Sequence, residues 1–432
     1  MGDGIPGNAS LRDRLGSALE AMRSSFGFPA AVAMVLGLGI GFAMPALDTA
    51  LDVDVPVFEF AGQDAARSLL ETVATTTVAV AGLAFSVTVV AFTLAASQLS
   101  PRVLRTFRAD RLSQLTLACF LGTFIYCLAV LVRLGSTPDG PQVPNLSITV
   151  AVVLAIASFA LFTAFIAHIV RMLQPSSVID GIRSTGREVV AKPYPAGVGS
   201  EPDDEEAAWR AVERRRGAGD GTPVRARDDG YLSSFRAQGV LAAAAACDAL
   251  VEQRVEVGDY VMPGTELARI WCDDDERREA LVERVRDAFV CGRQRTPVQD
   301  PAFPIRQLAD IALKGLSPGI NDPTTAENAM EALTALLIHA AQAERPSPLR
   351  TDEDGTVRLV ARAPDLDALV RLGFEQAQVF AASDPVVSRR LVALLERVEL
   401  VAAEAGLRCK EPARQAARAA VAAETAESGA AA

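Results

Sequence analysis

Small and hydroxyl-bearing side chains recur at helical spacing along one long uncharged stretch of this 432-residue chain. Residues three, four or seven positions apart lie on one face of an α-helix. In a membrane, such a face either packs closely against another helix or lines a water-filled or ion-conducting path in an oligomer. Both interpretations stay open. Glu71 would stand at the outer mouth of such a path, with Arg102 and Arg105 at the inner mouth. The residues of this face are Thr72, Thr75, Ala79, Gly82, Ser86, Thr93 and Ser97.

A second set of polar residues surrounds a rigid turn that ends in Asp322-Pro323. Aspartate caps free helix amides and proline fits a first helical turn, so a helix is expected to start at Pro323. One interpretation is a cytoplasmic ligand or gating site for an anion or a small polar molecule. The other is a helix corner that needs Gly319 for its backbone geometry and Asp322 for capping. Arg306 and Asp310, one helical turn apart, can pair. The candidate residues are Arg306, Gln307, Asp310, Ser317, Asn321, Asp322 and Thr325.

Sequence motifs of common enzymes are absent from the chain. There is no GxSxG, P-loop, HExxH or Rossmann glycine pattern. The two histidines and six cysteines, none in a CxxC pair, cannot supply a zinc cage of the usual spacing. We therefore expect no enzyme, no metal site and no cofactor.

Four stretches almost free of charge must position the membrane face described above. The mean hydropathy is +0.23 although 22% of the residues are charged, so the charges are segregated. Each stretch reaches the roughly 20 residues that cross a bilayer. A transmembrane domain at 24–171 is predicted, and the lipid bilayer is its first partner. Its helices are expected at 24–47, 69–100, 112–132 and 147–170.

Arginine placement predicts the orientation of these helices. The loop after the second helix has four arginines within ten residues, whereas the first loop is acidic. Positive loops stay in the cytoplasm. We therefore expect a bacterial inner-membrane protein with a cytoplasmic N-terminus, 1–23, and a cytoplasmic C-terminal part.

The C-terminal part should be α+β. A linker with a short helix is expected at 172–222, and short strands separated by Gly-Asp and Pro-Gly turns predict a small β module at 223–272. This pattern is similar to a barrel-sandwich hybrid. A helical domain should occupy 273–410, with a hairpin near 351–361, and the alanine-rich tail 411–432 should be disordered.

Individual helices of this part can also be placed. Short helices are expected at 203–216 and 242–251, and a longer one at 274–291. The last helix, starting at Asp384-Pro385, has a stripe that requires a partner helix. The stripe consists of Val387, Leu391, Leu394, Val398 and Val401.

Net charge excludes one class of partner. Residues 1–171 have ten basic and eleven acidic residues, and the remainder has 32 basic and 42 acidic ones. An acidic soluble region lacks the lysine and arginine that neutralise phosphates, so we expect no nucleic-acid binding.

Three blocks of the sequence, 92–111, 122–126 and 300–326, together carry a resemblance that extends over nearly the whole chain. They resemble a bacterial family of predicted membrane proteins of unknown function, to which the Ser-Pro-Gly-Ile-Asn-Asp-Pro turn belongs. The resemblance implies an inner-membrane protein with four helices and a cytoplasmic domain, and it implies no activity. Pro304 departs from the glycine expected after Phe303.

Two functions are compatible with these observations. The first is a homo-oligomeric channel-like or transporter-like protein for ions or small solutes, with its path along the second helix and a regulatory cytoplasmic domain. The alternative is a non-transporting scaffold or sensor whose cytoplasmic domain binds an unidentified ligand or partner.

Overall fold

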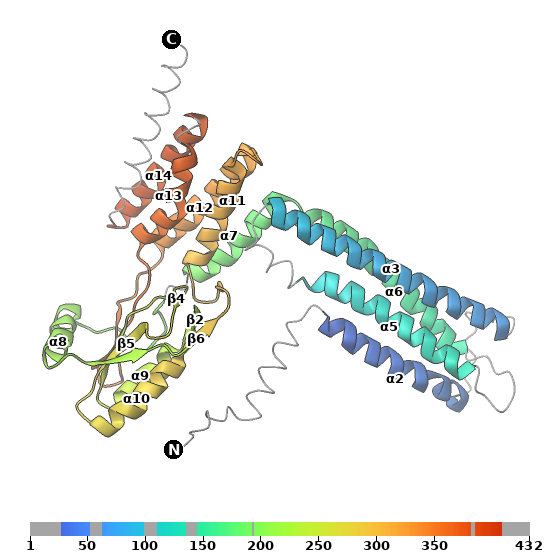
Figure 1. The fold of residues 1–432 in the computed structure, drawn as a ribbon, viewed down its shortest axis with the longest axis horizontal. Helices are drawn as coiled ribbons and strands as arrows, with labels where there is room; N and C mark the ends of the chain where they lie inside the picture. The colour runs from blue at the N-terminus through green and yellow to red at the C-terminus, as the bar shows by residue number, and fades with distance from the viewer. Residues whose placement is uncertain are drawn as a thin grey trace, which may run out of the picture. The chain divides into compact units, whose positions relative to one another are not determined.

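The computed structural model describes residues 27–51, 63–98, 110–134, 145–191, 194–381 and 385–407 (Figure 1). The chain divides into two compact units, Met1–Gln174 and Pro175–Ala432. The N-terminal residues 1–23, Arg102 and Arg105, Asp384 and the tail 411–432 lie outside the described residues.

Among its described residues, the first unit contains four helices that are long and apolar enough to cross a membrane. Each contains most of one predicted span, and α3 begins before its expected start at 69. The central helix α5 packs against each of the other three. The bounds are Phe28–Leu51 for α2, Gln63–Gln98 for α3, Arg111–Leu134 for α5 and Asn145–Met172 for α6.

Close backbone contact joins α2 to α5. A Cβ placed on Gly37 would lie 2.4 Å from the carbonyl oxygen of Gly122, and one on Gly41 would lie 2.6 Å from the Cβ of Ala129. Small residues permit such an approach where lipid gives helices no hydrophobic drive to associate. The neighbouring Gly39 faces open space, so only part of the glycine-rich stretch serves the contact.

Polar groups fix the ends of these helices. Asp48, on α2, accepts hydrogen bonds from the backbone N of Ser147 (3.0 Å) and from its hydroxyl (3.0 Å), and so caps the start of α6. Asp110 caps α5 through the backbone N of Ser113 (2.9 Å), and its Oδ1 lies 2.8 Å from Nε2 of His168 on α6. The two caps satisfy helix-end amides that would otherwise have no partner, and the contact with His168 links the start of α5 to α6.

The second unit combines two β-sheets with helices. A five-stranded sheet has the order β1-β5-β3-β8-β7, with only β3 and β8 parallel, and a three-stranded antiparallel sheet has the order β4-β2-β6. The strands are Thr222–Arg225 (β1), Gly230–Phe235 (β2), Leu250–Gln253 (β3), Tyr260–Val261 (β4), Glu266–Trp271 (β5), Phe289–Gly292 (β6), Leu349–Thr351 (β7) and Val357–Val360 (β8).

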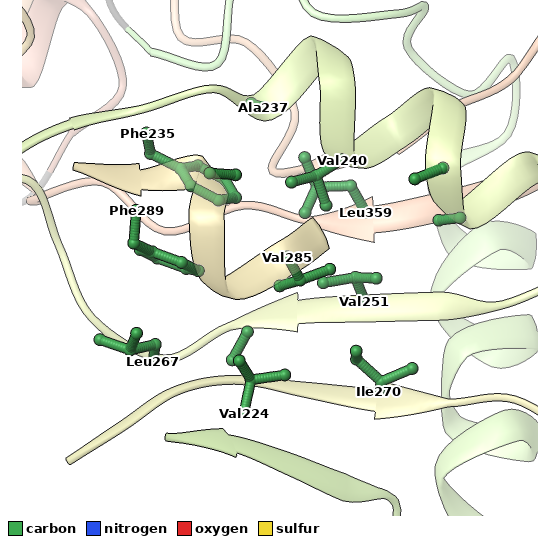
Figure 2. Close-up of a cluster of buried hydrophobic side chains, with 14 of the residues drawn as sticks. Val224, Phe235, Ala237, Val240, Val251, Leu267, Ile270, Val285, Phe289 and Leu359 are labelled. Atoms are coloured by element: carbon green, nitrogen blue, oxygen red, sulfur yellow. The ribbon is translucent and has the colours of Figure 1, made fainter. Parts of the chain in front are cut away.

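A shared core holds these sheets together (Figure 2). Buried side chains from β1, β3 and β5 meet Val240 of α9, Val285 of α10 and Leu359 of β8. The expected module 223–272 therefore does not close on its own, because β6, β7 and β8 come from later in the chain. The β7–β8 pair lies where the hairpin was expected.

Helices complete the second unit. The helices α11, α12 and α13 pack on one another, α7 packs on α11 and α12, and α14 packs on α12 (Figure 1). The bounds are Pro175–Ala191 (α7), Glu205–Gly217 (α8), Ala237–Ala246 (α9), Asp275–Ala288 (α10), Ala302–Leu316 (α11), Pro323–Gln342 (α12), Leu366–Ala381 (α13) and Pro385–Glu404 (α14).

Three local predictions need correction. The helix expected at 274–291 ends at Ala288, because Phe289 enters β6 and stacks on Phe235 of β2 at 4.4 Å between ring centroids. The helix expected at 242–251 lies earlier, as α9, and β3 begins at Leu250. The region expected as a linker contains the 17-residue helix α7.

The stripe predicted on the last helix does have a partner. Four of its side chains, Val387, Leu391, Leu394 and Val398, are buried. The helix that they belong to, α14, packs on α12 and α13.

Candidate functional site

One side of α3 is packed against the rest of the first unit. Its buried residues recur every three or four positions, mostly as alanine, and its two halves belong to separate hydrophobic clusters with α5 and α6. This row was not recognised from the sequence, because alanine is common throughout the helix. The buried row is Ala66, Leu70, Ala74, Thr77, Ala81, Ala84, Thr88, Ala91 and Ala95.

The polar face that the sequence singled out lies on the opposite side of α3. All seven of its residues are exposed, and at 3.6 residues per turn they point away from the buried row. No helix of this chain therefore covers them in the part that the structure describes. We call Thr72, Thr75, Ala79, Gly82, Ser86, Thr93 and Ser97 the outer row.

Most hydroxyls of the outer row bond back to their own helix. The hydroxyl of Thr72 donates to the carbonyl of Ser68 at 2.7 Å, and that of Thr93 to the carbonyl of Val89 at 2.8 Å. Thr75 and Ser86 make no side-chain hydrogen bond to any described residue. An unpaired hydroxyl in hydrocarbon is costly, so in lipid these two side chains would have to bond back to their own helix, as Thr72 and Thr93 do.

Exposed hydroxyls of this kind are concentrated on α3. Where exposure is described, α2 and α5 expose no serine or threonine, and α6 exposes only Thr163. The exposed side of α2 instead consists largely of valine, leucine, isoleucine and phenylalanine, as expected for contact with lipid. Leu83 and Val90, also exposed, border the outer row. The outer row thus differs from a lipid-facing surface.

The predicted mouths of the path are only partly described. Glu71 is exposed near the start of α3 and pairs with Arg67 at 2.9 Å. Arg102 and Arg105 lie outside the described residues. Their role at the inner mouth stays a prediction.

The turn between α11 and α12 is satisfied by its own groups. Asp322 accepts a hydrogen bond from the backbone N of Thr325 at 3.0 Å and so caps α12, as predicted. The backbone N of Asn321 donates to the carbonyl of Ser317 at 2.9 Å. The left-handed position is Asn321, with φ of 48°, and not Gly319. Asparagine tolerates this conformation better than most residues.

The other candidate residues of this motif lie toward the far end of α11. Arg306 pairs with Asp310 at 3.2 Å, as predicted, and its Nη2 donates to Gln376 of α13 at 3.4 Å. Gln307 is buried. With a rise of about 1.5 Å per residue, Arg306 is roughly 15 Å from the turn. The structure therefore does not bring the two halves of the motif together.

A buried ion pair that the sequence reasoning missed fixes the start of α11. Asp300, 1% exposed, accepts from the backbone N of Ala302 (3.0 Å) and Phe303 (3.1 Å), and from two nitrogens of Arg295 (2.8 and 2.9 Å). Burial raises the pKa of Asp300 above its ordinary value, although Arg295 and the two amides oppose the shift. The signal was present as Asp300-Pro301, the same dipeptide that marks α12.

Gly258 allows a turn of the β module to contact this pair. Its φ is 101°, and a Cβ there would lie 2.4 Å from Oδ2 of Asp300 and 2.5 Å from Nη2 of Arg295. The Arg295–Asp300 pair therefore connects the β module to the start of α11.

The second unit also contains a large cavity, of about 1260 Å³. The end of β2 and the first turn of α9 form one wall, and the C-terminal ends of α7 and α12 form another. None of the residues proposed from the sequence lines it. Among the residues that the structure describes, no cluster of three or more His, Cys, Asp or Glu side chains could hold a metal ion.

Comparison with known proteins identifies similar sequences. The profile of a family described as "Predicted membrane protein (DUF2254)" matches residues 23–397. Uncharacterized proteins of Mycobacterium bovis (Mb1321c) and Mycobacterium tuberculosis (Rv1290c) are each 30% identical to this chain over 393 residues. The alignments cover 89% of this chain and 72% of each relative. No solved structure matches the chain.

Proposed function

This chain belongs to the DUF2254 family of predicted membrane proteins, and we propose that it forms an inner-membrane assembly that conducts ions or small solutes. Several copies contribute their outer rows to one path. Both termini and the second unit lie in the cytoplasm, as the arginine-rich loop after α3 and the acidic loop before it favour.

One observation supports the path most strongly: apart from the exposed Val90 between Ser86 and Thr93, this face of α3 is polar or small, and no described part of the chain covers it. Facing lipid, its hydroxyls could bond only to carbonyl groups of their own helix. Facing a path shared by several copies, it would meet water. A single chain leaves this side of α3 open and cannot enclose a path alone. The proposal therefore requires an oligomer.

Flux through liposomes containing the purified full chain tests this proposal. Replacing Gly82 or Ser86 by leucine narrows a path lined by the outer row, and we expect flux to fall by roughly tenfold or more. Val89→Leu is the matched control, because Val89 is exposed on the same helix but outside the outer row. It should leave flux within about twofold of the unmodified protein.

Flux of cations, anions and small osmolytes would be measured in parallel. Absence of flux for all three, from protein shown to be folded and inserted, rejects the path. A single copy per particle in mild detergent and in bilayer nanodiscs would also contradict it.

The cavity of the second unit favours a second candidate function, ligand binding by a membrane-attached sensor. Its volume is large for a ligand pocket, and pockets of this kind are the usual place for small-molecule binding. A thermal-shift screen of metabolites, nucleotides and peptides against the full chain tests this candidate. A melting temperature that no compound raises would contradict it.

A further inference from the structure

The cavity of the second unit lies between two walls with different secondary structure. Arg236 and the first turn of α9 belong to the β-module wall. Glu188, near the end of α7, and Glu344, which follows α12, belong to the helical wall. About 1260 Å³ exceeds the ~300–1,000 Å³ typical of small-molecule pockets, so a peptide of three residues fits with space to spare.

Much of the lining is apolar and rigid. Val298 has 73% of its surface exposed, more than any other large hydrophobic side chain described outside the membrane-length helices. Tyr194 lines the cavity, and its ring meets that of the buried Phe235 edge to face at 6.4 Å. Several prolines stiffen the surrounding loops. An apolar ligand segment would remove this surface from water.

Half of the charged side chains of the lining already have partners within the chain. Glu201 pairs with Arg350 at 3.1 Å, and Glu205 accepts from the hydroxyl of Ser347 at 3.0 Å. Arg362 pairs with Glu256 at 3.0 Å, and Asp365 caps α13 through the backbone N of Ala368. These side chains hold the walls in place and are not available to a ligand.

The remaining charges have opposite signs on the two walls. Arg236 precedes α9, makes no capping hydrogen bond and has no ion pair with any described residue. The partial positive charge of the first turn of α9 adds to it. Glu188 and Glu344 likewise have no partner among the described residues, and the negative ends of α7 and α12 add to them. Arg345, beside Glu344, offsets only part of this charge.

We propose that the cavity binds a short apolar peptide with free termini, its carboxylate at Arg236 and its ammonium group at Glu188 and Glu344. The apolar side chains of the peptide cover Val298 and Tyr194. This inference rests on the second candidate function, ligand binding by the second unit, and is independent of the path along α3.

Three forms of one tripeptide test the proposal on the full chain in nanodiscs. Ala-Leu-Ala has both charges, its N-acetyl form lacks the ammonium group, and its C-terminal amide lacks the carboxylate. Calorimetry should give a dissociation constant for the free tripeptide that is about tenfold lower than for either blocked form, because each blocked form loses one charge-assisted contact with the exposed Arg236, Glu188 or Glu344.

Two substitutions assign each end of the peptide. Arg236→Gln should weaken binding of the free tripeptide by about tenfold and leave binding of the amide unchanged. Glu188→Gln should also weaken binding of the free tripeptide by about tenfold, because it removes a partner of the ammonium group, and leave binding of the N-acetyl form unchanged. Arg345→Gln is the matched control, since it removes an exposed arginine of the same lining, and should not weaken binding.

The possible results separate this inference from the function on which it rests. Equal affinity for all three forms would overturn recognition of the two termini while leaving ligand binding in place. Binding of none of the three forms would overturn the inference, and the metabolite and nucleotide screen would then decide separately whether the second unit binds any ligand.

Discussion

The two sides of α3 are built from similar residues and have different surroundings. The inner side has nine buried positions, mostly alanine, and includes Thr77 and Thr88, whose hydroxyls bond back to the helix. The outer row has five hydroxyl residues together with Ala79 and Gly82, and all are exposed. Small size serves close packing on the inner side. On the outer side, no described part of the chain packs against the small residues.

This difference separates stability from function within one helix. Substitutions on the inner side should damage the fold of a single chain, because the side chains of α5 and α6 occupy the space. Substitutions in the outer row should leave that fold intact and change only what the assembled protein does.

The largest effect on the fold is expected where two backbones touch. Gly37→Leu places side-chain atoms where the carbonyl of Gly122 lies, only 2.4 Å from an added Cβ. We expect a loss of about 3 kcal/mol or more in the free energy of unfolding, measured by denaturant titration in detergent. Gly39→Leu is the control, because its Cβ would meet nothing within 4 Å. Equal destabilisation by both would show that α2 and α5 do not pack in this way.

A smaller effect separates the two sides of α3 directly. Ala84→Leu overfills a buried position, and we expect a loss of about 1–3 kcal/mol in unfolding free energy. Ser86→Leu, two residues away in the outer row, should change it by less than about 0.5 kcal/mol. Thermal unfolding in detergent compares them. A larger loss from Ser86→Leu than from Ala84→Leu would reverse the assignment of the two sides.

The smallest effect concerns carboxylates at helix ends. Asp48→Ala removes the cap from the start of α6, and a loss of about 1 kcal/mol is expected. Glu71→Ala breaks only an exposed pair with Arg67, which should cost less than about 0.5 kcal/mol. The same unfolding measurement applies. If Glu71→Ala were the more damaging change, the exposed end of α3 would have a partner that the single chain lacks.

Features with strong local signals could be predicted from the sequence. Uncharged length identified the four long helices, and the Asp322-Pro323 pair identified the cap and start of α12. The stripe on α14 indicated a buried face before its partner was known. In each case the residues that carry the signal lie close together in the chain.

Features that depend on distant segments were missed. Phe289 looks like the continuation of a helix until Phe235 is placed opposite it. The ligand-site interpretation of the 300–326 motif required its two halves to converge, but α11 is long enough to separate them. The inner row of α3 is hidden among other alanines, because only packing distinguishes Ala81 and Ala84 from Ala79.

Water access to single cysteines on α3 tests the central claim most directly. In a chain with its six cysteines replaced, cysteine would be placed at Ala79, Gly82 and Ser86, and separately at Phe85 and Val89. The protein in liposomes would then be treated with a charged, membrane-impermeant thiol reagent. We predict rapid labelling at the three outer-row positions and slow labelling at Phe85 and Val89. Equally slow labelling at all five positions, in protein that is folded and inserted, would contradict a water-filled path along α3.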